Sequence, residues 1–503
     1  MSSKGQMKIK QKRKIIYGLT TLLSVSVIAG CSAPSGISAL QEKLESPKQW
    51  HSPQLNSLET PRENAGSVQD NKVTQQWLLT FNDNALNQLV QLALNHNRQL
   101  KVEQANLLLA EQRAIVAGVT QFPELSLSQG NARRRAISNN EAQYTTNADI
   151  SLQLSYELDY LGKLSDKQHQ AALEYESAKS QFQQHQINLI ANVTKSWFNF
   201  IEAKQLLNLY QERANNLKNN LEMIQSSYRL GLNQALDVYL TQNDVSRELA
   251  RVAEQQQMLL VRKRSLELLI GQYPQGTLDD NQSLPTLTTD IGVGLPSDLL
   301  TQRADIVASW YQLLALDAGL AVAHKQRFPK ISLTASTGDS SDELANLLDG
   351  SRLAWSLIGN ITLPLFDAGR LASLEEQARL AVVKYEQQYI DLVFNAFADV
   401  ENAISNNTAL KQRYLHFEQA AENAKAAETI SFDKYIRGLV SYTTVLESQR
   451  RAFDAQTSLI SLSNQLLQNR VALHQALGGS AFVEDTAALD PEISSSEHNT
   501  VSE

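Results

Sequence analysis

The chain has 503 residues but only 21 glycines and 11 prolines, so it offers few turns and favours long, mostly helical elements. Its single cysteine excludes a disulfide framework and a cysteine-based zinc or iron–sulfur site. Its formal net charge of −8 excludes the basic surface that nucleic-acid phosphates require, so no nucleic acid is expected as a partner.

The N-terminus has the pattern of a secretory signal peptide. Residues 1–14 contain six lysines and arginines and no acid, and residues 15–30 are apolar or small and too short to span a bilayer. The sequence Ile-Ala-Gly-Cys at 28–31 resembles the bacterial lipobox, in which cleavage exposes a cysteine that carries lipid. We therefore expect a signal peptide at 1–30 and lipidation of Cys31. Ser32, in place of the Asp that signals inner-membrane retention in the enterobacterial sorting pattern, implies the outer membrane.

The sequence matches itself when it is shifted by 206 or 207 residues. "QFPELSLS" at 121–128 aligns with "RFPKISLT" at 327–334, and "LIG" at 269–271 aligns with "ALG" at 476–478. A Tyr-x-x-Gly-Leu motif occurs in both copies, as Tyr228, Gly231 and Leu232 and as Tyr435, Gly438 and Leu439. These matches predict two copies of one structural unit, at 77–271 and 297–480, with a linker at 272–296.

Each copy has the same predicted order of elements. A helical segment at about 83–120, and again at about 297–327, ends at Phe-Pro, where proline starts an extended segment. Two extended runs follow, and then a helix without Gly or Pro, between Gly162 and Gly231 and between Gly369 and Gly438, that would span about 100 Å. After the Gly-Leu turn the chain reverses into a second helix, at about 236–270 and 442–477. Residues 31–76 are expected to form an extended, lipidated tether, and the acidic 481–503 a disordered tail.

The extended run "ADISLQLSYELDY" alternates apolar and polar residues along its whole length. Its apolar face comprises Ile150, Leu152, Leu154, Tyr156, Leu158 and Tyr160. Alone, this pattern fits a strand of a soluble sandwich equally well, but about a dozen alternating residues match a tilted membrane strand. The counterpart "LAWSLIGNITLPLFD" presents a similar face from Leu353 to Leu365. One chain supplies only four such strands, so other subunits would have to close the barrel.

The long helices show coiled-coil spacing in their second halves. The first seam is Tyr210, Ala214, Leu217, Leu221, Ile224 and Tyr228, and the helix after the turn is expected to continue it with Val245, Leu249 and Val252. The second seam is smaller and more polar: Phe417, Ala421, Ala424, Glu428, Ser431 and Tyr435. The two copies are therefore not expected to pack identically. The eight histidines lack metal-ligand spacing, and no phosphate loop or nucleophile elbow occurs, so we expect neither an enzyme nor a bound metal or cofactor.

These features together resemble the TolC-type outer-membrane efflux family over about residues 73–480. "LPSDLLTQRADIVAS" at 295–309, "PLFDAGRL" at 364–371 and the two Tyr-x-x-Gly-Leu turns carry the resemblance. The lipobox and "LPSDLL" point to the lipoprotein branch (NodT/OprM-like) that serves resistance-nodulation-division pumps. Gln-Arg-Ala-Asp-Ile at 302–306 departs from the Arg-Arg-Pro-Asp-Ile common in that branch.

The resemblance implies an α+β membrane protein that forms a homotrimer, with a 12-stranded β-barrel continued by a periplasmic α-helical barrel. It implies a passive exit duct in the outer membrane of a Gram-negative bacterium, contacting outer-membrane lipid and exporting small toxic compounds such as drugs, dyes, detergents or metal ions. Its partners would be a periplasmic membrane-fusion adaptor protein and an inner-membrane pump, of the resistance-nodulation-division type. Two alternatives stay open: the duct of an ABC-exporter (type I) protein secretion system, and a lipid-anchored periplasmic coiled-coil scaffold without a pore.

The resemblance also implies site residues near the two turns. The adaptor-docking tips would comprise Tyr228, Gly231, Leu232, Gly438 and Leu439, and the periplasmic gate would comprise Asp237, Tyr435 and Glu447. Glu447 keeps one of the two acids that form a cation-binding ring in the founding type, whereas Thr444 replaces the other acid and Val440 replaces a latching arginine. The closed state is therefore expected to depend less on charge pairs.

Overall fold

The computed structural model describes residues 77–138, 141–232, 234–279, 283–287, 299–342 and 353–479, and the single residues 37, 47, 50 and 296. The described chain divides into two compact units, one built mainly from 106–179 and 308–391 and one from 46–105, 180–307 and 392–479. The expected signal peptide, Cys31, nearly all of the tether and the tail 481–503 lie outside the described residues.

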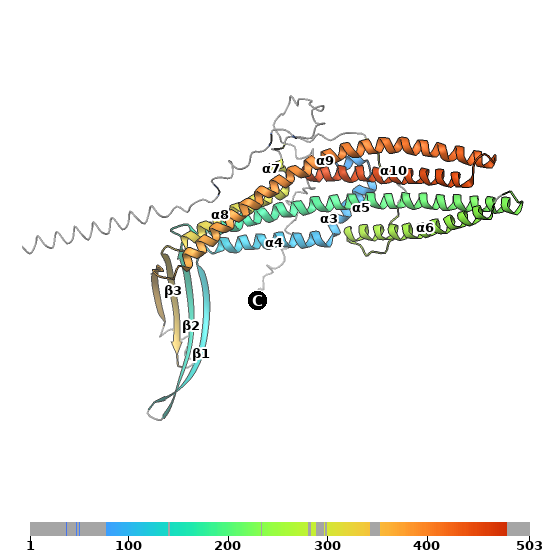
Figure 1. Ribbon diagram of the computed structural model, residues 1–503. Helices are drawn as coiled ribbons and strands as arrows, with labels where there is room; N and C mark the ends of the chain where they lie inside the picture. Colours follow the sequence, from blue (N-terminus) through green and yellow to red (C-terminus); the bar gives the residue numbers. More distant parts are fainter. Residues whose placement is uncertain are drawn as a thin grey trace, which may run out of the picture. The chain divides into compact units, whose positions relative to one another are not determined.

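Corresponding helices of the two copies have equal lengths (Figure 1). The pairs are α4 (Arg98–Val119) and α8 (Ala304–Lys325), 22 residues each; α5 (Lys163–Arg229) and α9 (Arg370–Ile436), 67 each; and α6 (Ala235–Leu269) and α10 (Tyr442–Ala476), 35 each. The first pair is offset by 206 residues and the other two pairs by 207. The duplication in the sequence is thus a duplication of structure, with its one-residue difference in the strand region.

The expected continuous helices at 83–120 and 297–327 are wrong in one respect, because each is interrupted. A 3-10 turn (η2, Leu78–Phe81) precedes α3 (Asn84–His96), which is separated from α4 at Asn97, and α7 (Leu299–Gln302) is separated from α8 at Arg303. Asn97 is extended; its side chain accepts a hydrogen bond from the Leu100 amide at 2.9 Å and donates one to the Leu269 carbonyl at 2.8 Å. The break is therefore fixed by a partner 172 residues away, which local periodicity does not reveal.

Four strands form one antiparallel sheet in the order β1-β2-β3-β4. They are β1 (Glu124–Ser138), β2 (Glu141–Leu158), β3 (Lys330–Ser341) and β4 (Ala354–Thr362). β1 and β2 are longer than predicted. β4 is shorter, because it ends two residues before Pro364, which has no amide hydrogen for a ladder bond. Leu363 and Leu365, predicted as strand residues, lie beyond it.

The register places apolar residues of all four strands on one face. Leu125 pairs with Leu154, Leu154 with Ala335, and Ala335 with Leu357. The next row on this face, which we call the apolar face, ends at Trp355, whose side chain is 79% exposed in the single chain. The opposite face is polar, with Ser128 hydrogen-bonded to Ser151 at 2.7 Å and Ser336 to Ser356 at 2.8 Å. The predicted alternation of the strands is therefore confirmed.

By length and composition α8 is the one helix of the described chain that could cross a membrane. It packs instead against both long helices of its unit. The Ser177 hydroxyl of α5 donates a hydrogen bond to the Ala308 carbonyl at 2.8 Å, and the ring of Trp310 lies 5.7 Å from that of Tyr389 on α9. The apolar composition of α8 is therefore explained by helix packing.

The largest core of the second unit joins the chain before α3 to the middle of α5. Asp83 caps α3 by accepting a hydrogen bond from the Leu86 amide at 2.9 Å, and its other oxygen accepts one from the Trp197 indole at 2.6 Å. The rings of Phe81 and Phe198 pack edge to face at 5.0 Å. Beyond this core, α5 and α6 form one antiparallel hairpin and α9 and α10 the other (Figure 1).

The two hairpins contact each other through α5 and α10. The rings of Tyr210 and Phe453 lie 4.8 Å apart, and Gln475 donates a hydrogen bond to Asn188 at 2.6 Å. Ala214, Leu217 and Ile224 of the predicted first seam are buried, whereas Tyr228 at its end is exposed. In the second seam only Ala421 and Ser431 are buried, so the two copies pack differently, as expected.

Candidate functional site

The two Tyr-x-x-Gly-Leu motifs form the same helix-ending turn. The amide of Gly231 donates to the Tyr228 carbonyl at 2.9 Å, and the amide of Leu232 donates to the Ser227 carbonyl at 2.9 Å. Gly438 donates to Tyr435 and Leu439 to Lys434, again at 2.9 Å. This pattern of two backbone hydrogen bonds defines the Schellman motif, which requires a residue in the left-handed conformation after the helix. The motif spacing therefore encodes the turn geometry.

Only the backbone conformation requires glycine at these turns. φ is +73° at Gly231 and +71° at Gly438, and a Cβ added at either position would have no neighbour within 4 Å. The flanking leucines point into open space, since Leu232 is 74% exposed and Leu439 69% exposed in the single chain. Each hairpin therefore ends in a rigid turn that presents an apolar side chain to a possible partner surface.

Tyr435, a predicted gate residue, lies in a small apolar cluster between the hairpins. Its ring is 5.2 Å from that of Tyr442, at an angle of 55°. The cluster contains Ile224, Tyr442 and Val445, with Val238, Phe432, Tyr435 and Leu446 packed against it, and so draws on α5, α6, α9 and α10. Packing of all four helices therefore fixes Tyr435.

Tyr442, which the sequence did not single out, is the most buried aromatic residue of this cluster. Its hydroxyl lies beside Thr241 and Asn220 but makes no hydrogen bond of good geometry within the described chain. Burial raises the pKa of Tyr442 to about 12, so the hydroxyl is neutral at all physiological pH values. Its position one residue after a turn serine gave no signal of this burial.

Asp237, the second predicted gate residue, occupies the first turn of α6. Its side chain is half-buried, and its described hydrogen bonds are made by its backbone: the amide donates to Gln234 at 3.2 Å, and the carbonyl accepts from the Thr241 hydroxyl at 2.7 Å. The adjacent Val238 packs against the cluster that includes Tyr435. The structure therefore brings Asp237 and Tyr435 to the same end of the hairpins.

Glu447, the third predicted gate residue, is held by two arginines of its own helix. Its Oε1 lies 2.8 Å from the Arg451 Nε, and its Oε2 lies 3.0 Å from Arg450 Nη2. These bonds, first to Arg451 and then to Arg450, lower the pKa of Glu447. Its carboxylate is therefore paired, and a cation would have to compete with both guanidinium groups.

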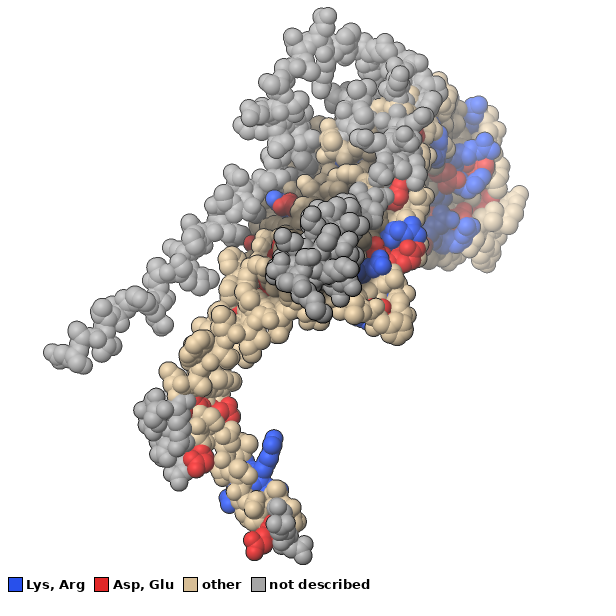
Figure 2. Space-filling view, turned by 90° about the vertical axis from the view of Figure 1, so that its left-hand side faces the viewer, with Lys and Arg blue, Asp and Glu red and all other residues tan. Residues whose placement is uncertain are grey.

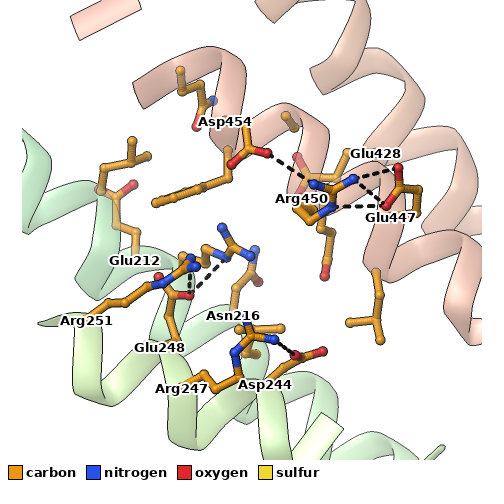
Figure 3. A pocket seen from close by; sticks show the side chains of 18 of the residues that line it. Glu212, Asn216, Asp244, Arg247, Glu248, Arg251, Glu428, Glu447, Arg450 and Asp454 are labelled. Carbon is orange, nitrogen blue, oxygen red and sulfur yellow. Dashed lines mark hydrogen bonds and ion pairs between the residues drawn. The ribbon is translucent and has the colours of Figure 1, made fainter. Parts of the chain in front are cut away.

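A cavity of about 550 Å³ lies between the two hairpins (Figure 3). Glu447, Arg450 and Asp454 line it from α10, whereas Asp244, Arg247, Glu248 and Arg251 line it from α6. Arg213 of α5 lies between the two groups, with its guanidinium carbon 4.1 Å from the centre of the Phe453 ring. The cavity is thus bounded by paired charges of both signs.

Glu248 is the most buried charged residue of this cavity, with 2% of its surface exposed. Its Oε2 lies 3.4 Å from Arg213 Nε and 3.7 Å from Arg251 Nη1, whereas its Oε1 has no hydrogen-bond partner within the described chain. Burial raises the pKa of Glu248 and lowers that of Arg213. Glu248 and Arg213 therefore form a buried, incompletely satisfied pair.

The predicted α6 stripe of Val245, Leu249 and Val252 is confirmed at Val245 and wrong at Leu249. In this part of α6 the buried residues are Thr241, Val245 and Glu248, whereas Val252 is half-buried and Leu249 is exposed. These three positions are four and three residues apart, as expected for one face of a helix. Glutamate, however, is rarely buried in proteins, so its residue type predicts an exposed side chain at 248. Only Arg213 and Phe453, from two other helices, explain why a glutamate faces inward here.

The motif at 302–306 also proves to be structural. Arg303 is buried and binds Asp305 at 2.7 Å, Asp399 at 3.1 Å and the Ala476 carbonyl at 3.4 Å. Ala304, which replaces the proline of the resembling branch, is the first residue of α8. A first helical residue needs no amide partner, so proline is favourable there but not required. The departure from the branch pattern is therefore compatible with the same fold.

Comparison with known proteins agrees with the fold. Residues 89–272 and 295–479 match the family "Outer membrane efflux protein". The solvent efflux pump outer membrane protein SrpC of Pseudomonas putida is 30% identical over 416 residues, which cover 79% of this chain and 86% of SrpC. The probable outer membrane lipoprotein SilC of Salmonella typhimurium is 27% identical over 474 residues, 92% of this chain and 98% of SilC.

The solved structure of the Campylobacter jejuni CmeC outer membrane channel has the same fold. It superposes with a TM-score of 0.78 at 22% identity, over 88% of this chain and 96% of the CmeC chain. SrpC is named as an outer membrane protein of a solvent efflux pump and SilC as a probable outer membrane lipoprotein, and neither is named as an enzyme. This chain therefore belongs to the outer membrane efflux protein family and is an outer membrane efflux channel with a TolC-type tandem-repeat fold.

Proposed function

We propose that the chain acts as a homotrimer, as the passive exit duct of a tripartite efflux system. An inner-membrane pump, of the resistance-nodulation-division type, would supply the energy, and a periplasmic adaptor protein would open the duct at the two turns. The exported compounds would be small and toxic: drugs, dyes, detergents or metal ions. The observation that best supports this proposal is the repeated Schellman turn with an exposed leucine at the end of both hairpins.

The sheet supports assembly into a closed barrel. Its apolar face is exposed in the single chain, and β1 and β4 each have one neighbouring strand. An unpaired backbone group in lipid costs several kcal/mol, so these two edges require strands of other subunits. Three chains would give the 12 strands that the family resemblance implies. A periplasmic scaffold without a pore would leave the apolar face of this sheet unexplained.

Lipidation of Cys31 belongs to the same proposal. The name of SilC, an outer membrane lipoprotein that aligns over 92% of this chain, supports it. The intact mass of the purified protein should correspond to cleavage before Cys31 plus acyl chains, and Cys31→Ser should lack the acyl mass. A mature wild-type protein without acyl mass would refute the anchor.

The gate proposal combines Asp237, Tyr435 and Glu447 with the cluster around Tyr442. Because Glu447 is already bound to Arg450 and Arg451, packing of the apolar cluster around Tyr442 would contribute more to closure than a cation-binding ring. Asp237 and Tyr435 would close the turns and an adaptor would separate them. This arrangement agrees with the expectation that closure depends less on charge pairs.

The test is drug sensitivity in a strain that lacks this gene and related ducts. The wild-type gene should restore resistance to dyes and detergents, whereas Leu232→Asp with Leu439→Asp should not, because acids at the turns would prevent apolar docking. Tyr273→Asp, an exposed change in the linker, is the matched control and should restore resistance. Equal sensitivity of the deletion strain and its parent to every compound would contradict the proposal. Dependence on a secreted protein and an ABC transporter would instead favour the secretion duct.

A further inference from the structure

The β1–β2 hairpin extends beyond the rest of the sheet (Figure 1). β2 pairs with β3 only as far as Ala148 and Ser341, but it continues to pair with β1 as far as Glu141 and Ser138. We call this two-stranded extension, 131–138 with 141–148, the ribbon. Its far end is opposite the end at which α4 enters β1 and β2 leads into α5. Since the helical part of the family lies in the periplasm, the ribbon lies on the outer side of the membrane.

Three consecutive arginines occupy the ribbon. Side chains alternate between faces along a strand, so Arg133 and Arg135 lie on the same face as Leu125 and Leu127, whereas Arg134 lies on the opposite face. Arg135 pairs directly with Tyr144, and the guanidinium carbon of Arg133 lies 5.2 Å from the centre of the Tyr144 ring. Tyr144 thus orients Arg133 through a cation–π contact and leaves its N–H groups free to bind an anion.

Their distance along the strand places these arginines just outside the hydrocarbon layer. On β2 the apolar face runs from Leu158 to Ile150, which is about 27 Å along the strand and about 20 Å in height at a tilt near 40°. This height agrees with the apolar band of a membrane barrel. Arg133 pairs with Thr146, four residues beyond Ile150 and about 14 Å farther along the strand. That level corresponds to lipid headgroups.

The charge of this face is positive. The described strands contain four basic residues, Arg133, Arg134, Arg135 and Lys330. Basic side chains stand out on this part of the molecule in Figure 2. Glu141 and Asp149 lie on the opposite face, and among the described strand residues the nearest acid on the same face is Asp339, in register with Ile150. Two arginines with no neighbouring acid on the same face of the described strands suit phosphate, which a guanidinium binds with two parallel hydrogen bonds.

We propose that Arg133 and Arg135, supported by Tyr144, bind the phosphate groups of the glycolipid in the outer leaflet of the outer membrane. The apolar face below them contacts the acyl chains of the same lipid, so one lipid molecule meets both parts of the surface. The site fixes the outer edge of the barrel at the headgroup level. Arg134, on the polar face, takes no part in this contact.

The proposal is tested by binding of lipid A to the full-length protein in detergent. Wild-type protein should retain bis-phosphorylated lipid A, and Arg133→Gln with Arg135→Gln should bind it about tenfold or more weakly, because each basic residue near an anionic lipid adds appreciably to affinity. Arg134→Gln is the matched control and should bind as the wild type does. Elution of each variant as the same oligomer in size exclusion checks folding.

A second arm needs no variant. Dephosphorylated lipid A keeps the acyl chains and sugars, so wild-type protein should bind it as weakly as the double variant binds the phosphorylated lipid. Inorganic phosphate at millimolar concentration should not displace lipid A, because it lacks the acyl contacts. Equal binding of phosphorylated and dephosphorylated lipid A by the wild type would overturn the proposal. So would an equal loss of binding in Arg134→Gln.

Discussion

At the residue scale, glycine ends four helices for two different reasons. Gly231 and Gly438 need only the left-handed conformation, since a Cβ there meets nothing. At Gly271 and Gly478 φ is +76°, and a Cβ would also lie 2.3 Å from the His96 carbonyl oxygen and 2.8 Å from that of Gln302, respectively. The two copies carry the same glycines, but the glycine at the turn of each hairpin and the glycine at its other end are required for different reasons.

Alanine substitution should separate the two constraints. Gly438→Ala should lower the free energy of unfolding by about 1 kcal/mol, the cost of a left-handed alanine. Gly271→Ala should cost clearly more, because the backbone must also move away from His96. Thermal unfolding followed by circular dichroism measures both. Equal losses in the two variants would show that the close approach at Gly271 does not matter for stability.

A buried histidine makes stability depend on pH. The ring centres of His474 and Trp77 lie 5.0 Å apart, and burial, with a smaller contribution from Arg470, lowers the pKa of His474 from its usual 6.5 to about 4. Between these values the unfolded chain binds a proton that the folded chain does not, so stability falls as the pH falls. The loss amounts to about 2 kcal/mol at pH 5.

His474→Phe keeps the ring stacked on Trp77 and removes the titration. We expect the wild type to lose more thermal stability than this variant between pH 7.5 and pH 5. The difference between the two pH slopes isolates the histidine from all other groups. Identical slopes would mean that His474 is protonated without cost in the folded state.

At the element scale, the sheet has the apolar face on one side and a polar face on the other. Leu357 and Ser356 are neighbours on β4 but lie on opposite faces. Leu357→Arg should destabilise the assembled protein by about 2–4 kcal/mol and reduce its amount in the outer membrane, because the charge would face lipid. Ser356→Arg adds the same charge to the polar face and should be tolerated. Membrane fractionation measures both, and equal amounts of the two variants would contradict the assignment of faces.

Packing of α5 against α6, beside Phe453 of the other hairpin, depends on the buried pair of Arg213 and Glu248. Glu248→Gln should destabilise the protein by about 2 kcal/mol, because Arg213 is left without its anion beside Phe453. Arg213→Met combined with Glu248→Met should recover most of that loss, because no charge then remains buried. A double-mutant cycle on thermal stability measures the coupling. Additive effects of the two substitutions would mean that the pair does not act as a unit.

Sequence reasoning succeeded where a pattern is local. Helices of 67 residues follow from the absence of Gly and Pro, and the strand faces follow from the alternation around Leu152 and Leu154. It failed where the local structure or the burial of a side chain depends on a residue distant in the sequence. The break at Asn97 depends on Leu269, and the burial of Glu248 depends on Arg213 and on Phe453 of the other hairpin. Periodicity identifies the buried face of a helix or strand but not which side chains of other elements pack against it.

The candidate site divides in the same way. The turns at Gly231 and Gly438 were predictable, because their spacing encodes the hydrogen bonds that form them. The burial of Tyr442 was not predictable, because it depends on helices of both copies that meet at the same end of the hairpins. The pairing of Glu447 with Arg450 and Arg451 follows from helical spacing of three and four, and the sequence alone could have suggested it.

At the scale of the whole molecule, two copies of one unit supply two strands and one long hairpin each, which makes a closed barrel possible only through association. The sheet supplies the membrane face, and the two turns supply the ends at which the duct would open. Family membership establishes an outer membrane efflux channel. Passive conduction through an assembly that the turns close is the proposal that unites these parts.

Conductance of the purified full-length protein in a planar lipid bilayer tests this proposal most directly. The wild type should give small, discrete current steps, because in the proposed closed state the turns narrow the duct. Asp237→Ala and Tyr435→Phe should each raise the conductance by loosening the turns, and Leu415→Ala, an exposed change on α9 away from them, should leave it unchanged. No current from any of these proteins in a bilayer that contains the assembled oligomer would contradict the duct. Equal conductance of the wild type and both turn variants would contradict the gate.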